Sequence, residues 1–271
     1  MTKNIQTKEN LQRIENIQCD TLGAIFNIDY NNVNMTVDEK DTMFQGNKLA
    51  GYHFAGKSAL HSILIALIAN GIDIKNVKTV LDFACGYGRV LRYIKLSFPD
   101  AKIYACECDE EALKFCASTF QVTPILSGDP NNADGAMLPE KVDLIWVGSL
   151  FTHFSVSGWG KFIEFFSSIL NPNGLLIFTC RSELSKVVGK KSISPEETIL
   201  LERGYKENGF GFAQYTASIG GHSNYGLSVS EPGWVSNFLG NYPSLRLASY
   251  VERGWMLGQD IVTCIKEDDL D

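Results

Sequence analysis

Short apolar runs alternate with segments of helical periodicity along the middle of the chain. The apolar runs are bounded by charged or turn residues and predict buried strands, at Lys78–Phe83, Lys102–Glu107, Val122–Leu126, Val142–Val147 and Leu175–Cys180. The amphipathic segments between and before them predict helices, at Lys57–Asn70, Arg89–Ser97, Asp109–Phe120 and Trp159–Leu170. Strands that are separated by helices indicate an α/β fold, in which a parallel sheet has helices on both faces.

The C-terminal part of the chain has a different pattern. Two apolar runs, Leu245–Tyr250 and Ile261–Lys266, are joined by a short connection and predict an antiparallel pair. We therefore expect five parallel strands that are extended by a C-terminal antiparallel hairpin.

Two further segments lie outside this regular alternation. Residues 1–50 are polar, and we interpret them as an N-terminal extension with a short amphipathic helix, whose apolar face comprises Leu11, Ile14 and Ile17. Residues 183–241 are more than one crossover helix needs. We interpret residues 183–229 as an insertion over the substrate pocket within a single domain of residues 51–271.

A glycine turn follows the first predicted strand, and it is the most informative motif of the chain. The run Asp82-Phe83-Ala84-Cys85-Gly86-Tyr87-Gly88 leads from this strand into a helix, and Glu107 ends the next strand. Glycines let a backbone approach a ligand, and a carboxylate at the second strand end accepts hydrogen bonds from ribose hydroxyls. A dinucleotide fingerprint has a small third residue where this chain has Leu91, and no P-loop follows the strand.

The pattern D-x-A-x-G-x-G resembles the first motif of the class I S-adenosylmethionine-dependent methyltransferases, [DE]-x-G-x-G-x-G, and departs from it only at Ala84. The resemblance is to the bacterial branch that acts on small molecules and sugars. It implies a Rossmann-like seven-stranded sheet and S-adenosylmethionine as cofactor. The cofactor-binding residues that it implies, together with an N-terminal tyrosine that could fold over the cofactor, are Asp82, Ala84, Cys85, Gly86, Tyr87, Gly88, Glu107, Cys108, Asp129, Ser149 and Tyr52.

The segment after the fourth strand, Ser149-Leu150-Phe151-Thr152-His153-Phe154, resembles the S-[LV]-F-[ST]-H pattern of bacterial methyltransferases. Methyl transfer requires alignment of the nucleophile with the methyl carbon and removal of a proton. His153 is therefore a candidate general base, and its alternative role is to cap or pack the next helix. His222, in a glycine-rich segment, is the second catalytic candidate, with a solvated loop position as its alternative.

Composition narrows the classes of partner. The 271 residues carry a formal net charge of -7 with a pI of about 5.2, which argues against general binding to nucleic acid or to an anionic membrane. The longest apolar run, Ile63–Ala69, is too short to span a bilayer.

The N-terminus lacks a secretory pattern. The chain has seven cysteines, an odd number, which suits reduced thiols in the cytoplasm. No metal site is expected, because Cys106 and Cys108 have no third ligand nearby.

We therefore expect methyl transfer from S-adenosylmethionine to an oxygen of a small-molecule or carbohydrate-type acceptor. Three alternatives remain open: a non-catalytic module that binds S-adenosylmethionine or S-adenosylhomocysteine, an NAD(P)-dependent oxidoreductase, and a nucleic-acid methyltransferase. Leu91 disfavours the oxidoreductase. The lack of an N-P-P-[YF] run after the fourth strand disfavours the nucleic-acid enzyme. The sequence indicates no oligomeric state.

Overall fold

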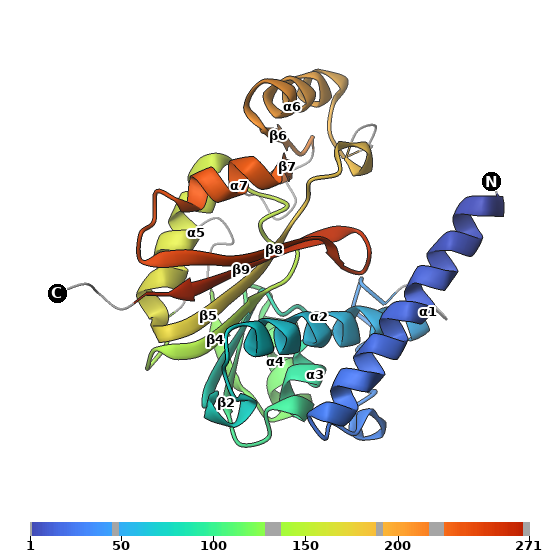
Figure 1. Ribbon diagram of the computed structural model, residues 1–271, viewed down its shortest axis with the longest axis vertical. Coiled ribbons are helices and arrows are strands. Elements are labelled where there is room, and N and C mark those ends of the chain that lie inside the picture. Colours follow the sequence, from blue (N-terminus) through green and yellow to red (C-terminus); the bar gives the residue numbers. More distant parts are fainter. Residues whose placement is uncertain (1, 45–48, 128–136, 188–191, 217–224, 268–271) are drawn as a thin grey trace.

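The structure is a computed structural model that describes residues 2–44, 49–127, 137–187, 192–216 and 225–267, without the side chains of residues 2–12. Its centre is a seven-stranded sheet (Figure 1), in the order β3 (Thr123–Leu126), β2 (Lys102–Glu107), β1 (Thr79–Phe83), β4 (Val142–Val147), β5 (Leu170–Cys180), β9 (Gln259–Lys266) and β8 (Leu245–Trp255). The first five are parallel, β9 is antiparallel to β5, and β8 pairs antiparallel with β9. The predicted fold class is confirmed.

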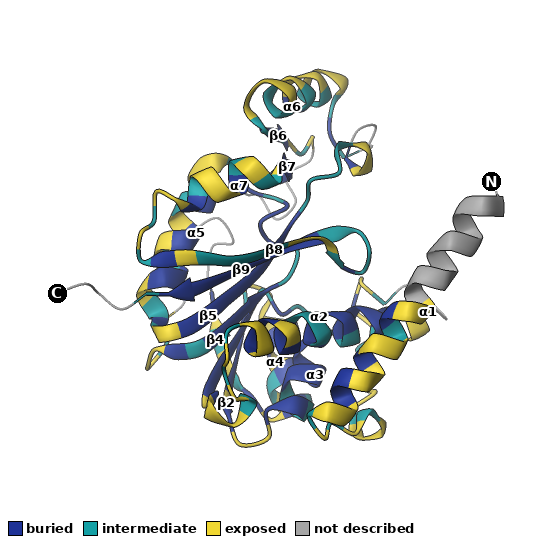
Figure 2. Cartoon of the chain, in the orientation of Figure 1, coloured by how far each residue is buried: buried dark blue, intermediate teal, exposed yellow. Residues whose placement is uncertain are grey.

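Helices cover both faces of the sheet. One face packs against α2 (Leu49–Ala69), α3 (Leu91–Ser97) and α4 (Glu110–Phe120) in an apolar core. The other face packs against α5 (Val156–Ile169) and α7 (Pro232–Leu239). Figure 2 shows the result, a sheet of buried strands between helices whose outer positions are exposed. Short 3-10 turns lie at Tyr30–Asn32, Ile74–Asn76 and Leu184–Lys186.

Helix starts follow local capping chemistry. Asp109 precedes α4, and its side chain accepts hydrogen bonds from the Glu111 and Ala112 amides. The α3 helix begins at Leu91, two residues later than the periodicity predicts, because the chain is still in the glycine turn at Gly88, which has a φ of 77°.

The β5 strand begins earlier than expected. Residues 171–174, which precede the predicted strand, are part of it, next to a register shift between β4 and β5 at Val142 and Leu144.

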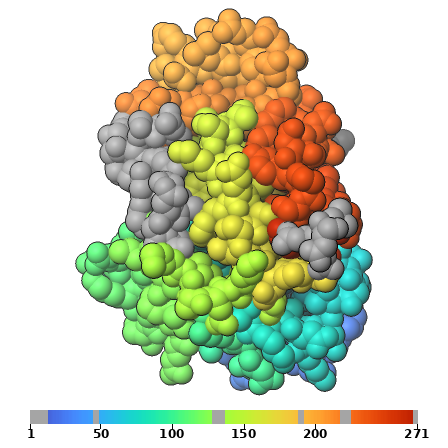
Figure 3. Space-filling model, turned by 90° about the vertical axis from the view of Figure 1, so that its left-hand side faces the viewer, coloured from blue at the N-terminus to red at the C-terminus, as the bar shows by residue number. Residues whose placement is uncertain are grey.

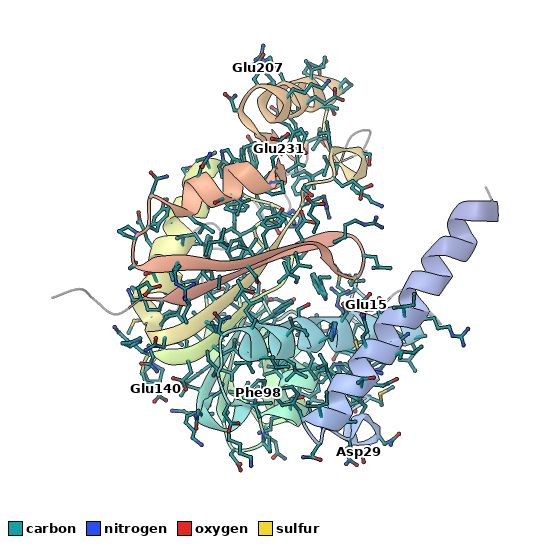
Figure 4. All side chains as sticks on the ribbon, in the orientation of Figure 1. Glu15, Asp29, Phe98, Glu140, Glu207 and Glu231 are labelled. Atoms are coloured by element: carbon teal, nitrogen blue, oxygen red, sulfur yellow. The ribbon has the colours of Figure 1, made fainter. Side chains whose placement is uncertain are left out.

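The predicted apolar face of the N-terminal helix is wrong. Helix α1 (Thr2–Ile25) exposes Ile14 and Ile17, and buries Glu15, Cys19 and Leu22 instead. On this buried side Ser58 of α2 donates a hydrogen bond to the carboxylate of Glu15, the residue that Figure 4 labels on α1.

The N-terminal part of α2 also differs from the expectation. The helix begins at Leu49, so the expected domain boundary at residue 50 lies within it. Ile68, predicted to lie on its apolar face, is 50% exposed.

The segment after β5 contains α6 (Pro195–Asn208) and a two-stranded hairpin of β6 (Phe210–Gln214) and β7 (Gly226–Ser230). It has a small apolar core of its own, which comprises Val187, Ile193, Leu201, Ala213, Leu227 and Val229. In Figure 3 α6, in orange, forms the upper end of the molecule. The structure thus contains an added layer within the predicted insertion. No helix among the described residues is both long and apolar enough to cross a membrane.

Candidate active site

A cavity of about 380 Å³ lies at the carboxyl ends of β1, β2 and β4, where open α/β sheets bind ligands. Most of the residues predicted from the sequence line it, namely Asp82, Ala84, Cys85, Gly86, Tyr87, Glu107, Cys108, Ser149 and His153. Asp129 and His222 lie outside the described residues. The strand order therefore brings the glycine turn, the second-strand carboxylate and the histidine candidate to one cavity.

Glu107 holds the glycine turn through its carboxylate. The Gly86 amide donates to Oε2 at 2.8 Å, and the Cys108 amide donates to Oε1 at 2.7 Å. The Cys108 thiol also donates to Oε1, at 3.1 Å. A carboxylate has about four lone-pair sites, so Oε2, which has one donor among the described residues, keeps acceptor capacity toward the cavity.

The two glycines of the turn have different surroundings. Both have positive φ, 52° at Gly86 and 77° at Gly88. A Cβ on Gly86 would meet no atom within 4 Å, whereas a Cβ on Gly88 would lie 2.4 Å from the Phe120 ring. Gly86 therefore leaves open space for a ligand, and Gly88 allows the turn to pack on α4. Gly88 does not line the cavity. Ala84 has a φ of 59°, which a side chain rarely adopts.

Asp82 is a buried carboxyl group on the cavity wall. Its side chain is 2% exposed, and Oδ2 is fully buried without a hydrogen-bond partner within the described residues. Burial, and then the charge of Glu107, raise the pKa of Asp82 well above its usual value. A cation or a hydrogen-bond donor placed in the cavity would satisfy this oxygen.

Ser149 is fixed by a hydrogen-bond network that joins three strands. Its amide donates to Thr179 Oγ1 at 2.6 Å, and its hydroxyl accepts from Gln259 Nε2 at 2.9 Å. Thr179 also donates to Gln259 Oε1 at 2.6 Å. The network orients the start of the 149–154 segment on the cavity wall.

His153 is oriented by the β6–β7 hairpin. Its Nδ1 lies 2.8 Å from the Gly226 carbonyl oxygen, which can only accept, so Nδ1 carries the hydrogen and Nε2 keeps its lone pair. The Tyr215 hydroxyl lies 2.9 Å from Nδ1, and the Tyr225 ring stacks on the imidazole with centroids 4.9 Å apart. Burial, with a smaller contribution from the charge of Arg181, lowers the His153 pKa to about 4. The ring is therefore neutral at pH 7.

Tyr52 lies behind the cavity wall. It is buried, its hydroxyl donates to Asp41 Oδ2 at 2.6 Å, and it accepts from Arg92 at 3.2 Å. Arg92 also donates to the carbonyl oxygens of Asn34 and Thr36. Tyr52 therefore anchors the N-terminal segment, whose residues Asp41, Thr42 and Met43 line the cavity in its place.

Two residues that line the cavity were not among the sequence-based site candidates, Arg89 and Trp255. Arg89 directly follows the glycine turn, lines the cavity, and stacks over the Trp255 ring at 5.5 Å. Its guanidinium has no salt bridge within the described ranges. The sequence signal that could have identified Arg89 is its position directly after the glycine turn. Trp255 is 2% exposed and donates to the Ala55 carbonyl, yet it also lines the cavity.

Comparison with known proteins gives a family match at the centre of this site. Residues 80–174 match the family model described as a methyltransferase domain. A curated relative, the ribosomal RNA small subunit methyltransferase H of Campylobacter fetus subsp. fetus, is 42% identical over 60 residues, which are 22% of this chain and 19% of that protein. The match thus spans less than a fifth of the relative.

Solved structures share the fold at low identity. An S-adenosylmethionine-dependent methyltransferase from Clostridium acetobutylicum is 16% identical with a TM-score of 0.54, over 78% of this chain and 92% of that one. DesVI from Streptomyces venezuelae is 15% identical with a TM-score of 0.54, over 85% and 99%. Magnesium protoporphyrin IX methyltransferase from Synechocystis, solved with S-adenosylhomocysteine, is 15% identical with a TM-score of 0.51, over 82% and 89%.

The strand order and the matched domain define an α/β protein with a methyltransferase domain at its core. The chain therefore shares the fold of solved S-adenosylmethionine-dependent methyltransferases, and its residues 80–174 match a methyltransferase domain.

Proposed function

We propose that this protein transfers a methyl group from S-adenosylmethionine to an oxygen of a small-molecule or carbohydrate-type acceptor, with His153 as general base. The observation that carries the proposal is the common cavity of the glycine turn, the Glu107 carboxylate and the neutral His153 imidazole. We further propose that the protein acts in the cytoplasm, where its seven free cysteines stay reduced.

The residues of the donor side fit the methyl donor. Gly86 leaves open space beside the turn, so the backbone can approach the methionine moiety. Glu107 Oε2 would accept from the ribose hydroxyls, and Cys108 would line the wall beside the base. The unpartnered Asp82 oxygen fits the ammonium group, and the Arg89 guanidinium fits the carboxylate of the same moiety. The cofactor, when bound, supplies an electrophilic methyl group on a sulfonium.

The residues on the acceptor side of the cavity would take up the proton that the acceptor hydroxyl loses. The Gly226 carbonyl fixes the His153 tautomer, so that Nε2 can accept the hydroxyl proton of the acceptor as the oxygen attacks the methyl carbon. Leu150, Phe162 and Tyr225 add apolar and aromatic wall to this part of the cavity. Oxygen is favoured as the acceptor atom because a hydroxyl has to lose a proton during transfer, which gives the base a role.

The proposal is tested by turnover with a panel of hydroxylated small molecules and sugars. Purified protein with S-adenosylmethionine should release S-adenosylhomocysteine only when a suitable acceptor is present, and mass spectrometry should locate the new methyl group on oxygen. A methyl group on nitrogen or carbon would contradict the oxygen assignment. Binding of S-adenosylhomocysteine without consumption of the donor across the panel would favour a non-catalytic module.

A further inference from the structure

Arg181 is a cation near the candidate catalytic centre that forms no ion pair with any of the described residues. It directly follows the last residue of β5, at the carboxyl edge of the sheet. Its Nε is fully buried without a hydrogen-bond partner among the described residues. Burial lowers the pKa of this group from its usual value. A guanidinium nitrogen that is buried without a hydrogen-bond partner is costly, while the rest of this half-buried side chain is left to contact a ligand.

Two carboxylates, Asp260 and Glu183, act on Arg181 through their charge, and the Glu183 Oε2 is itself buried without a hydrogen-bond partner among the described residues. Asp260 accepts from the Tyr250 hydroxyl at 2.8 Å and from the Arg253 amide at 2.7 Å. Glu183 lies 3.7 Å from the Lys186 ammonium and accepts from the Ser185 hydroxyl. Neither forms an ion pair with the Arg181 guanidinium, which therefore keeps its donors for a further anion.

The backbone joins Arg181 to the His153 site. The Ser230 amide of β7 donates to the Arg181 carbonyl at 2.8 Å. At the other end of the same strand, the Gly226 amide donates to the His153 carbonyl, and the Gly226 carbonyl accepts from the His153 ring. Five residues of β7 therefore connect the two positions. The Arg181 charge also acts on the His153 and Tyr215 side chains, so the three groups share one neighbourhood.

We propose that Arg181 binds an anionic group of the methyl acceptor, a carboxylate or a phosphate, and holds the reacting hydroxyl near His153. The planar guanidinium offers paired donors that match either anion. Arg181 lies outside the lining of the donor cavity, as expected for a group that contacts the acceptor rather than the cofactor. The assignment rests on the proposed methyl transfer and narrows its substrate class from any hydroxyl compound to an acidic one.

The test measures anion binding by titration calorimetry, with the full chain saturated by S-adenosylhomocysteine. Two matched pairs of probes separate the sources of negative charge: 3-hydroxybenzoate against its methyl ester, and glucose 1-phosphate against glucose. At least one anion should bind about 10–100-fold more tightly than its neutral match, the range of a charged hydrogen bond. The Arg181→Gln substitution should remove that preference, and Arg181→Lys should retain part of it.

Two readouts separate this role from a structural one. Arg203→Gln, on the exposed side of α6, is the matched control and should leave anion binding unchanged. Without anion, Arg181→Gln should unfold at the same temperature as the wild type or higher, because it removes a half-buried cation that forms no ion pair with the described residues. Anion binding that is equal in wild type and Arg181→Gln would overturn the proposal, as would equal affinity for both members of both pairs. Failure of S-adenosylhomocysteine itself to bind would instead contradict the proposed function.

Discussion

Around the glycine turn, the backbone at the cavity is held by one carboxylate, that of Glu107, which accepts from the Gly86 and Cys108 amides. Beyond Ser149 the wall is made of side chains from separate segments, with His153 oriented by β7 and flanked by Tyr215 and Tyr225. Under the proposed function, the first region binds the methyl donor and the second binds the methyl acceptor. A constant ligand can be bound by backbone geometry that the strand order sets, whereas a particular acceptor requires side chains that an added layer supplies.

Substitution of His153, in the second region, should have the largest effect on turnover. His153→Ala should slow turnover about 10²–10⁴-fold if the residue is the general base, and it should leave the affinity for S-adenosylhomocysteine unchanged. Steady-state kinetics and calorimetry on the same preparation check both. Tyr215→Phe, which removes only the hydroxyl near Nδ1, is the matched variant and should cost far less. A turnover rate for His153→Ala within a few-fold of the wild type would exclude the role of base.

Substitutions of the two glycines of the turn should have different effects: one should weaken cofactor binding, and the other should lower the stability of the fold. Gly86→Leu should weaken S-adenosylhomocysteine binding about 100-fold or more, equivalent to about 2.7 kcal/mol, because the side chain occupies the space left for the cofactor. Gly88→Ala should lower the free energy of unfolding by about 2–5 kcal/mol, since its Cβ meets the Phe120 ring at positive φ. Calorimetry and denaturant unfolding distinguish the two. The account fails here if Gly86→Leu binds the cofactor normally.

The pH dependence of turnover should report the burial of His153. Its pKa is lowered to about 4, so the neutral, proton-accepting form persists as the pH falls below 6.5. The acidic limb of the kcat profile should therefore lie below pH 5. Arg181→Gln removes a positive charge and should move this limb to higher pH. A wild-type limb near pH 6.5 would show that the base is not this buried histidine.

The smallest effect should come from Ala84. The left-handed backbone costs an alanine about 1–2 kcal/mol, and a glycine costs about 0.5–1 kcal/mol in chain entropy. Ala84→Gly should therefore raise the free energy of unfolding by up to about 1 kcal/mol, and denaturant unfolding would measure it. A clear loss of stability would show that the methyl group makes contacts that outweigh the strain.

The sequence predicted the main sheet well because its strands are encoded locally. Apolar runs predicted the seven strands of this sheet but not the β6–β7 hairpin, and the spacing of Gly86, Gly88 and Glu107 predicted a turn that the structure places on the cavity. The orientation of α1 could not be predicted, because the polar contact between Glu15 and Ser58 joins two distant helices. Arg181 has no motif, and only the tertiary structure reveals that it forms no ion pair with the described residues.

The central claim, that the glycine turn and Glu107 bind S-adenosylmethionine, is tested most directly by calorimetric titration of S-adenosylhomocysteine. The wild type should bind one equivalent, and Glu107→Ala should bind about 10–100-fold more weakly, because charged hydrogen bonds to the ribose are lost. Glu110→Ala, which removes an exposed carboxylate paired with Lys114, should bind normally. Binding of NAD without binding of S-adenosylhomocysteine, or unchanged affinity in Glu107→Ala, would contradict the account.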